Sequence, residues 1–198
     1  STALGYHAQS SGTNATAAGV DSIAAGGNSV ALGVQANAGG SGSAALGFAA
    51  NAAGSFSTAL GHYSHAAAID DVAIGSSTYA AATRSTAVGT LSRATGNGSS
   101  AFGGNANASG GHAIAIGYNS STSGNAGTAV GGQSKSGATG STAFGYSSNA
   151  AGAYASALGF GTLANATSSN ALGTDAKATG INSSAVGTLA NASGLASL

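Results

Sequence analysis

The sequence predicts an all-β fold, a parallel β-solenoid in which one short repeat forms one coil. Three observations predict it: a repeat period of 14 residues, glycine and alanine at fixed places in the repeat, and unusually small side chains. The period continues without insertion or deletion, so that fourteen copies fill residues 1–196. Self-similarity at a fixed short period is the signature of repeat architectures, in which each unit stacks on its neighbours.

The repeat has a clear consensus when its positions are numbered from Ser1. Position three is alanine and position five is glycine in every copy. Position four is a larger aliphatic residue or phenylalanine in thirteen copies, with Ala18 as the exception. Position ten is alanine in eleven copies, and position twelve is glycine or alanine in all of them. The consensus therefore reads S-T-A-L-G-x-x-A-x-A-x-G-x-x.

Two short strands per coil fit this repeat better than a helix. The unit is too short for a helical hairpin, and two glycines per unit would each cost a helix about 1 kcal/mol. Positions one to five and eight to eleven alternate with a period of two, as strands do. Glycine at positions five and twelve marks corners, where a positive φ or close backbone approach is needed. Each residue then stacks in parallel on its equivalent at about 4.8 Å, and we expect residues 1–198 to form a single repeat domain.

The composition argues against several classes of function. Charged residues make up 4% of the chain, against about 25% in ordinary globular domains, and proline, cysteine, methionine and tryptophan are absent. The formal net charge is zero, so no positive surface favours nucleic acid. The apolar runs are far shorter than the roughly 20 residues of a membrane-spanning helix. We therefore expect no enzyme and no nucleic-acid partner.

The titratable residues do not form a convincing catalytic or metal-binding set. Serine is so abundant that its proximity to any histidine means little, and His62 with His65 would lack a third metal ligand. The favoured interpretation of these two is a solvated surface pair. Asp70 and Arg84 occupy position fourteen of successive coils, which predicts a surface ion pair. We expect no catalytic residue, no bound metal and no cofactor.

The two strands of the coil differ in polarity. On the second strand, positions eight and ten are small while positions seven and nine are mostly polar, which predicts one inward and one wet face. On the first strand neither face carries charge, and a strand that is apolar on both faces is buried on both. The face that does not line the solenoid is covered most economically by another copy of the chain. Whether position four lines the interior or the symmetry axis stays open, and both alternatives predict a cyclic homo-oligomer.

Aromatic residues gather at position six of the repeat. Corner packing or a subunit contact is the favoured interpretation, and a patch that contacts a ligand is the alternative. The candidates for such a patch are Tyr118, Tyr146, Tyr154 and Phe160.

The repeat resembles that of the YadA-like head domain of trimeric autotransporter adhesins, which is similar to N-S-V-A-I-G-x-x-A-x-A-x-G. The closest copy is Asn28-Ser29-Val30-Ala31-Leu32-Gly33, and in-phase copies cover the whole chain. The motif residues, expected in the core or the trimer interface, are Asn28, Ser29, Val30, Ala31, Leu32, Gly33, Ala45, Leu46, Gly47, Ala59, Leu60, Gly61, Ala115, Ile116 and Gly117.

The resemblance implies a left-handed parallel β-roll of fourteen 14-residue coils, assembled as a homotrimer. It also implies display at the outer membrane of a Gram-negative bacterium, a part in virulence, and multivalent adhesion to collagen-, fibronectin- or laminin-like matrix proteins or host cells. The family's neck, coiled-coil stalk and C-terminal β-barrel anchor have no counterpart here. We therefore expect a fragment of a longer surface protein, attached to the membrane only through that missing anchor. An ice-binding or purely structural solenoid is the alternative, disfavoured because threonine occupies position two in only six copies.

Overall fold

The computed structural model describes residues 1–197, and their regular elements are short β-strands. The chain divides into two compact units, a first unit of Ser1–Gly98 and a second unit of Ser99–Leu198. Each unit is a parallel β-solenoid of seven turns, with two strands in every turn. The predicted all-β parallel solenoid of 14-residue coils is confirmed, whereas the expectation of a single domain stays a prediction.

The first unit contains two parallel sheets, one of odd-numbered and one of even-numbered strands. The odd-numbered sheet consists of β1 (Thr2–Leu4), β3 (Thr16–Ala18), β5 (Val30–Leu32), β7 (Ala44–Leu46), β9 (Thr58–Leu60), β11 (Val72–Ile74) and β13 (Thr86–Val88). The even-numbered sheet consists of β2 (Gln9–Ser10), β4 (Ile23–Ala24), β6 (Asn37–Ala38), β8 (Asn51–Ala52), β10 (His65–Ala66), β12 (Tyr79–Ala80) and β14 (Arg93–Ala94).

The second unit repeats this arrangement. Its odd-numbered sheet consists of β15 (Ser100–Phe102), β17 (Ile114–Ile116), β19 (Thr128–Val130), β21 (Thr142–Phe144), β23 (Ser156–Leu158), β25 (Asn170–Leu172) and β27 (Ser184–Val186). Its even-numbered sheet consists of β16 (Asn107–Ala108), β18 (Ser121–Thr122), β20 (Lys135–Ser136), β22 (Asn149–Ala150), β24 (Leu163–Ala164), β26 (Lys177–Ala178) and β28 (Asn191–Ala192).

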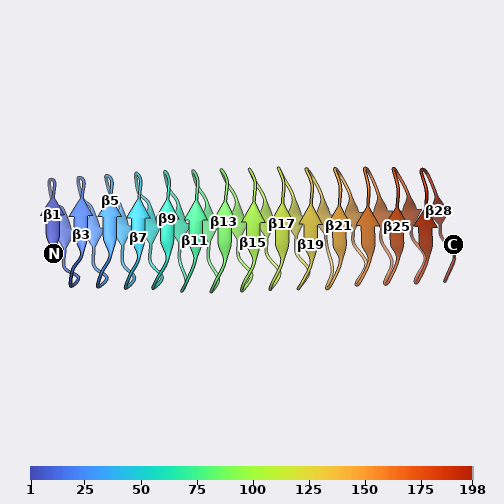
Figure 1. Ribbon diagram of the computed structural model, residues 1–198, viewed down its shortest axis with the longest axis horizontal. Coiled ribbons are helices and arrows are strands. Elements are labelled where there is room, and N and C mark those ends of the chain that lie inside the picture. The colour runs from blue at the N-terminus through green and yellow to red at the C-terminus, as the bar shows by residue number, and fades with distance from the viewer. Residues whose placement is uncertain (198) are drawn as a thin grey trace. The chain divides into compact units, whose positions relative to one another are not determined.

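Within each unit every strand pairs in parallel, and in register, with the strand 14 residues away (Figure 1). Ala31 of β5, for example, lies between Ala17 of β3 and Ala45 of β7. The ladder hydrogen bonds connect successive turns, as where the backbone N–H of Val30 donates to the carbonyl oxygen of Ser43 over 2.9 Å. Each side chain therefore lies next to the residues that occupy the same repeat position in the adjacent turns.

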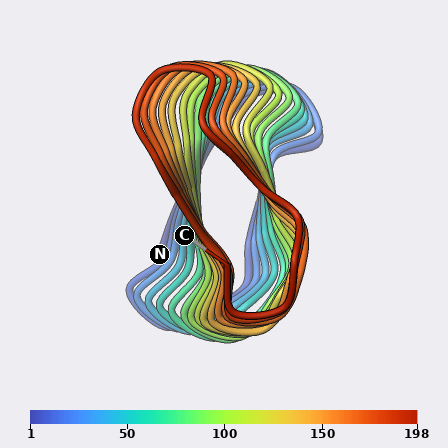
Figure 2. The same cartoon turned by 90° about the vertical axis from the view of Figure 1, so that its right-hand side faces the viewer.

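The strands are shorter than the sequence predicts, since they cover positions two to four and nine to ten of the repeat. The residues between them form tight turns, which make the two corners of each coil (Figure 2). At one corner the N–H of Ala36 donates to the carbonyl oxygen of Gly33 over 3.3 Å. Each corner contains a residue with positive φ, such as Gln35 at 58° and Asn28 at 57°. Positive φ is what the third residue of a type II turn requires.

Glycine at position five is required by both backbone conformation and space. Gly33 has a φ of 135°, a region that is essentially closed to residues with a Cβ. A Cβ added there would also collide with the carbonyl oxygen of Gly47 in the next turn. The predicted role of this glycine as a corner residue is thereby confirmed.

The interior of each solenoid is filled by very small side chains. Alanine at positions three and ten is at most 2% exposed in every turn after the first. Serine and threonine at positions one and eight are buried too in most turns, and many of their hydroxyls donate to carbonyl oxygens three residues earlier, as Ser29 does to Gly26 over 2.6 Å. Within residues 1–197 the hydroxyls of Ser43, Ser92, Ser99 and Ser183 have no such partner. Because buried polar groups need hydrogen-bond partners, these local bonds make serine compatible with the core.

We predict that Gly33→Ala lowers the free energy of unfolding by about 2 to 4 kcal/mol, because the new Cβ meets both an unfavourable φ and the next turn. The matched control is Gly39→Ala, where φ is not positive and the nearest atom would be 3.8 Å away. Denaturant unfolding followed by circular dichroism measures both variants. Equal losses in the two variants would contradict this account of position five.

Candidate interaction surfaces

The strand register decides which residues face the interior. Position three of the first strand points inward, so positions two and four point outward, on the opposite face of the odd-numbered sheet. In β5, Ala31 is fully buried while Leu32 is 38% exposed. Of the two alternatives that the sequence left open, the structure supports the second: position four is outside, and the solenoid has a thin core of alanine, glycine and serine.

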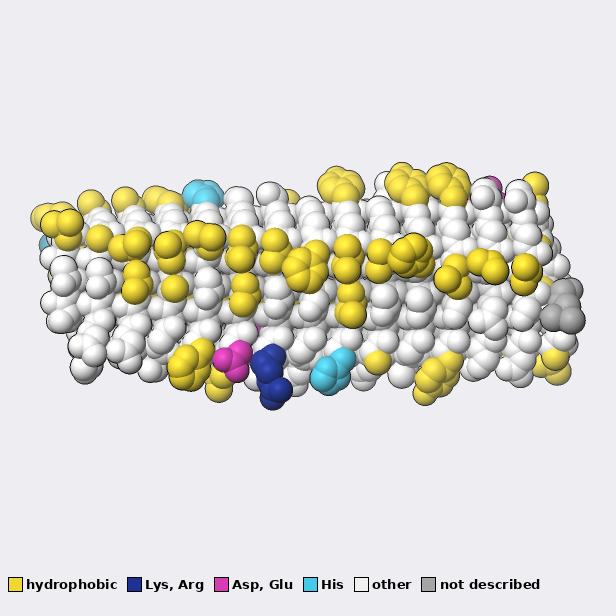
Figure 3. Space-filling model, in the orientation of Figure 1, with side chains coloured by type: hydrophobic (Ala, Val, Ile, Leu, Met, Phe, Trp, Pro, Cys, Tyr) yellow, Lys and Arg dark blue, Asp and Glu magenta, His cyan; other side chains and the backbone are white. Residues whose placement is uncertain are grey.

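The outer face of the odd-numbered sheet is an uncharged, largely apolar surface in each unit. Figure 3 shows hydrophobic side chains arranged in rows over these strands. Position four supplies exposed side chains to this surface. Their exposed fractions include 38% for Leu32, 42% for Leu60, 40% for Phe102 and Ile116, 56% for Phe144 and 49% for Leu172. Large aliphatic side chains repeated at this spacing make a continuous apolar stripe on each unit, and such stripes mark interaction surfaces.

The motif residues divide into an inner and an outer set. The buried members are Ser29, Ala31, Ala45, Ala59 and Ala115. The members whose side chains lie on the outer face are Val30, Leu32, Leu46, Leu60 and Ile116. The remaining members form the corners, as Asn28, Gly33, Gly47, Gly61 and Gly117 with positive φ. A role of the outer set in a trimer interface stays a prediction.

The predicted aromatic candidates do not form one patch. Tyr146 and Phe160, at position six of neighbouring turns, stack with ring centroids 5.6 Å apart and 15° between their planes. The Tyr146 ring also covers Gly132, since a Cβ added to that glycine would lie 3.2 Å from the ring. Tyr118 occupies the same position in the turn before Gly132, and therefore two turns before Tyr146. These three aromatic residues therefore share one corner of the coil.

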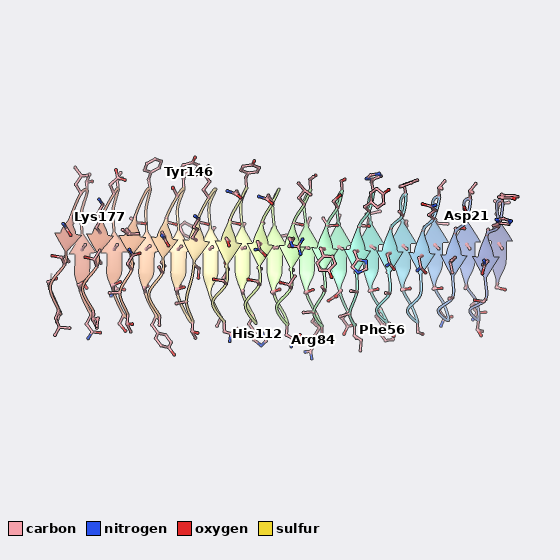
Figure 4. All side chains as sticks on the ribbon, turned by 180° about the vertical axis from the view of Figure 1, so that it is seen from behind. Asp21, Phe56, Arg84, His112, Tyr146 and Lys177 are labelled. Carbon is pink, nitrogen blue, oxygen red and sulfur yellow. The ribbon has the colours of Figure 1, made fainter. Side chains whose placement is uncertain are left out.

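Tyr154 lies at the opposite corner, because it occupies position fourteen of its turn. Figure 4 shows this separation within the second unit, with Tyr146 at one corner and His112, which shares the position of Tyr154, at the other. Tyr154 is 65% exposed, and its ring lies over Gly140 of the preceding turn. A ligand patch at the first corner would therefore consist of Tyr118, Tyr146 and Phe160 without Tyr154.

His62 and His65 of the first unit belong to different surfaces. His62 lies at a corner, stacked on Phe48 at 5.4 Å and against Tyr63 at 4.3 Å. His65 lies in β10 and stacks on Tyr79 of β12, with centroids 5.1 Å apart and 6° between the planes. Within residues 1–197 no three histidine, cysteine or acidic side chains gather as metal ligands. The two histidines thus have separate aromatic partners, which the sequence did not predict.

The outer face of the even-numbered sheet is polar, and the charged side chains that it carries within residues 1–197 are basic. The side chains of position nine lie on this face. The basic residues among them are Arg93 in the first unit and Lys135 and Lys177 in the second, and all three are exposed. Arg93 lies over the ring of Tyr79, with its guanidinium carbon 5.2 Å from the ring centroid. Sequence reasoning missed this row, although His65, Tyr79 and Arg93 occupy the same position in three successive copies.

The predicted ion pair is not formed. Among the described residues the single close contact between a basic and an acidic side chain joins Nδ1 of His7 to Oδ1 of Asp21 over 3.4 Å, at position seven of neighbouring turns. Asp70 and Arg84 do not pair. Asp71 is fully buried in a place where most turns have serine. Its carboxylate accepts hydrogen bonds from the N–H of Ala68 over 2.7 Å and from the N–H of Ser85 over 2.9 Å, so it replaces the serine within the local hydrogen-bond network.

Comparison with known protein families agrees with this geometry. The family described as YadA head domain repeat matches residues 1–22, 10–36, 24–48, 38–64, 66–92, 94–120, 108–134, 123–148, 136–162, 164–190 and 178–197. The chain belongs to this family. Membership indicates the YadA-like head of a trimeric autotransporter adhesin, a class of bacterial surface protein that is generally non-enzymatic. No curated protein matches the chain. The described part of this YadA-like head contains no helix long and apolar enough to span a membrane.

We predict opposite tolerances at two neighbouring residues of β7 in this YadA-like head. Ala45 is fully buried, so Ala45→Val overpacks the core and lowers the free energy of unfolding by about 1 to 3 kcal/mol. Ala44 points outward beside Val30 of the preceding turn, so Ala44→Val changes stability by less than about 0.5 kcal/mol. Thermal and denaturant unfolding compare the variants, and a larger loss for Ala44→Val would overturn the assigned register.

Proposed function

We propose that the chain is the head of a homotrimeric adhesin on the surface of a Gram-negative bacterium, where it attaches the cell to host matrix proteins or host cells without catalysis. The observation that carries this proposal is the uncharged apolar stripe on the outer face of the odd-numbered sheet. The trimer itself, its left-handed coiling and its surface location are supported by the family rather than by the geometry of one chain.

The stripe supports burial between copies of the chain. Position four places leucine, isoleucine, valine or phenylalanine outside in almost every turn, whereas the interior receives alanine and serine. Fully burying one such large side chain stabilises a protein by about 1.5 to 3 kcal/mol, far more than burying an alanine methyl. The strongest apolar contribution of this sequence is therefore available to an interface and not to the core of one chain.

The regular spacing of the stripe favours a rotation axis that runs along the direction in which the turns stack. With such an axis, each turn lies beside the same turn of the other copies, and every position four meets its own equivalents. Cyclic homo-oligomers bring identical surfaces together in this way.

An assembled head would present three copies of every remaining outer surface. The faces left free are the corners and the outer face of the even-numbered sheet, which repeat their polar groups turn after turn. Weak contacts multiplied along an extended ligand, and by three chains, give strong attachment without a deep pocket. Collagen-, fibronectin- or laminin-like matrix proteins are extended ligands of this kind.

The first prediction from this proposal concerns the mass in solution. Sedimentation or light scattering should give about 54 kDa, three times the chain mass of 18.0 kDa. Introducing charge into the stripe, as Leu32→Asp together with Leu60→Asp, should shift the mass toward 18.0 kDa, because desolvating two carboxylates per chain opposes assembly.

The matched control is Asn37→Asp with Asn51→Asp, which adds the same charge on the outer face of the even-numbered sheet and should leave the mass unchanged. Circular dichroism checks that all variants keep their β-structure. A wild-type mass of 18.0 kDa would refute the trimer, and ice binding would then be tested.

The second prediction concerns attachment. The wild-type chain should bind immobilised matrix proteins or cultured host cells, and the Leu32→Asp, Leu60→Asp variant should bind about a hundredfold more weakly because it loses multivalency. A Gln35→Asp, Ser77→Asp variant, which adds the same charge at exposed corner positions where other turns carry Asp21 and Asp175, provides the reference for assembled protein of equal charge. Undiminished attachment by the dissociated variant would show that binding does not depend on assembly.

A further inference from the structure

We propose that the outer face of the even-numbered sheet in the first unit binds an acidic polysaccharide, with the guanidinium of Arg93 receiving a carboxylate or sulfate group of the polymer. The proposal builds on the attachment function above, since it names a class of ligand for that function. Its site is separate from the apolar stripe, because the two sheets of a coil face in opposite directions.

Arg93 is positioned for an anion. It is exposed at the end of a row in which His65 stacks on Tyr79 and the guanidinium of Arg93 lies 5.2 Å from the centre of the Tyr79 ring. Among the described residues no carboxylate pairs with it. A guanidinium that lies over an aromatic ring keeps hydrogen-bond donors free, and their planar fork matches a carboxylate or sulfate group.

The charge on this face complements a polyanion. Position nine and the adjacent position eleven contain no aspartate in any turn, while position nine contains three of the four basic residues of the chain. The aspartates occupy other places: Asp21 and Asp175 lie at position seven, Asp70 lies at position fourteen, and Asp71 is buried. In the second unit, Lys135 and Lys177 make the same face basic. An acidic ligand therefore meets attraction and no opposing carboxylate there.

The shape and polarity of the row favour a polysaccharide over an acidic peptide. Asn37 and Asn51 continue the row in register with His65. Amide groups both donate and accept hydrogen bonds, as sugar hydroxyls do. From Asn37 to Arg93 the row spans roughly 19 Å at the usual strand spacing. A peptide would gain no main-chain hydrogen bonds on this face, because the ladder already uses those of the strands.

Small residues beside the row leave space for a polymer to lie along it. Position eleven next to the row is Gly39, Ala53, Ala67 and Ala81. These residues are exposed or half-buried, so the polar side chains of position nine stand beside a low, flat strip. A chain of sugar rings that lies along this strip contacts Asn51, Tyr79 and Arg93 together, so that residues of three different turns act as one site.

The test measures binding of the full chain to immobilised chondroitin sulfate, to hyaluronan, and to neutral dextran, by surface plasmon resonance. We expect binding to at least one polyanion and none to dextran, and the two polyanions distinguish recognition of sulfate from recognition of carboxylate. Arg93→Gln should weaken binding about tenfold or more, the effect of losing a charge-assisted hydrogen-bonded pair. Tyr79→Ala should weaken it about threefold through the lost support of the guanidinium, while Tyr79→Phe keeps the ring and the affinity.

The control is Arg84→Gln, which removes the same charge from an exposed arginine at a corner and should change affinity less than about twofold. Equal losses in Arg93→Gln and Arg84→Gln, or equal binding to dextran, would overturn the site. If the wild-type chain attaches to matrix proteins or host cells but binds neither polyanion, this inference fails while the adhesin function stands. If it binds a polyanion through Arg93 but attaches to no host surface, the site stands and the proposed host attachment fails.

Discussion

The in-register stacking of equivalent residues is the constraint on which the rest of the structure depends. Each turn lies directly on the next, so the backbone at a corner leaves no room for a Cβ at Gly33 against the carbonyl oxygen of Gly47. The same closeness restricts the interior to residues as small as alanine and serine, because the two strands of one coil are joined by only short turns. Because equivalent residues stack on one another, each position of the repeat has the same environment in every turn of the unit: the interior, an outer face or a corner.

A thin core has consequences for stability. An alanine interior buries few methyl groups per turn, so most of the order within one chain comes from the parallel ladder and from serine hydroxyls such as that of Ser29. Large side chains cannot enter this core, as the full burial of Ala45 beside the outward Leu46 illustrates. They lie outside instead, where their burial requires a second surface. Assembly is in this sense a consequence of the same close stacking that excludes bulk from the interior.

The repeat period made the coil, the parallel register and the corner glycines predictable from the sequence, because a 14-residue unit of alternating residues has few other solutions. The inward face was not predictable from polarity, since Ala31 and Leu32 are both uncharged, and only the space inside the coil separates them. The positive φ of non-glycine residues at the corners was also not predicted. Asparagine and glycine at position fourteen, as at Asn28 and Gly42, were the available signal, because both tolerate positive φ better than other residues.

The outward position nine explains why repeat analysis finds the architecture more readily than the binding residues. The core tolerates little variation, so its residues recur in every copy and define the consensus. A residue that points to solvent from a two-residue strand has no such restriction, and Tyr79 and Arg93 therefore each occur once at this position without disturbing the ladder. Only the structure shows that these single copies touch, since residues 14 apart in the sequence become neighbours on the sheet. In a solenoid of this kind, the candidates for specific ligand recognition are accordingly the outward residues that differ from the repeat consensus.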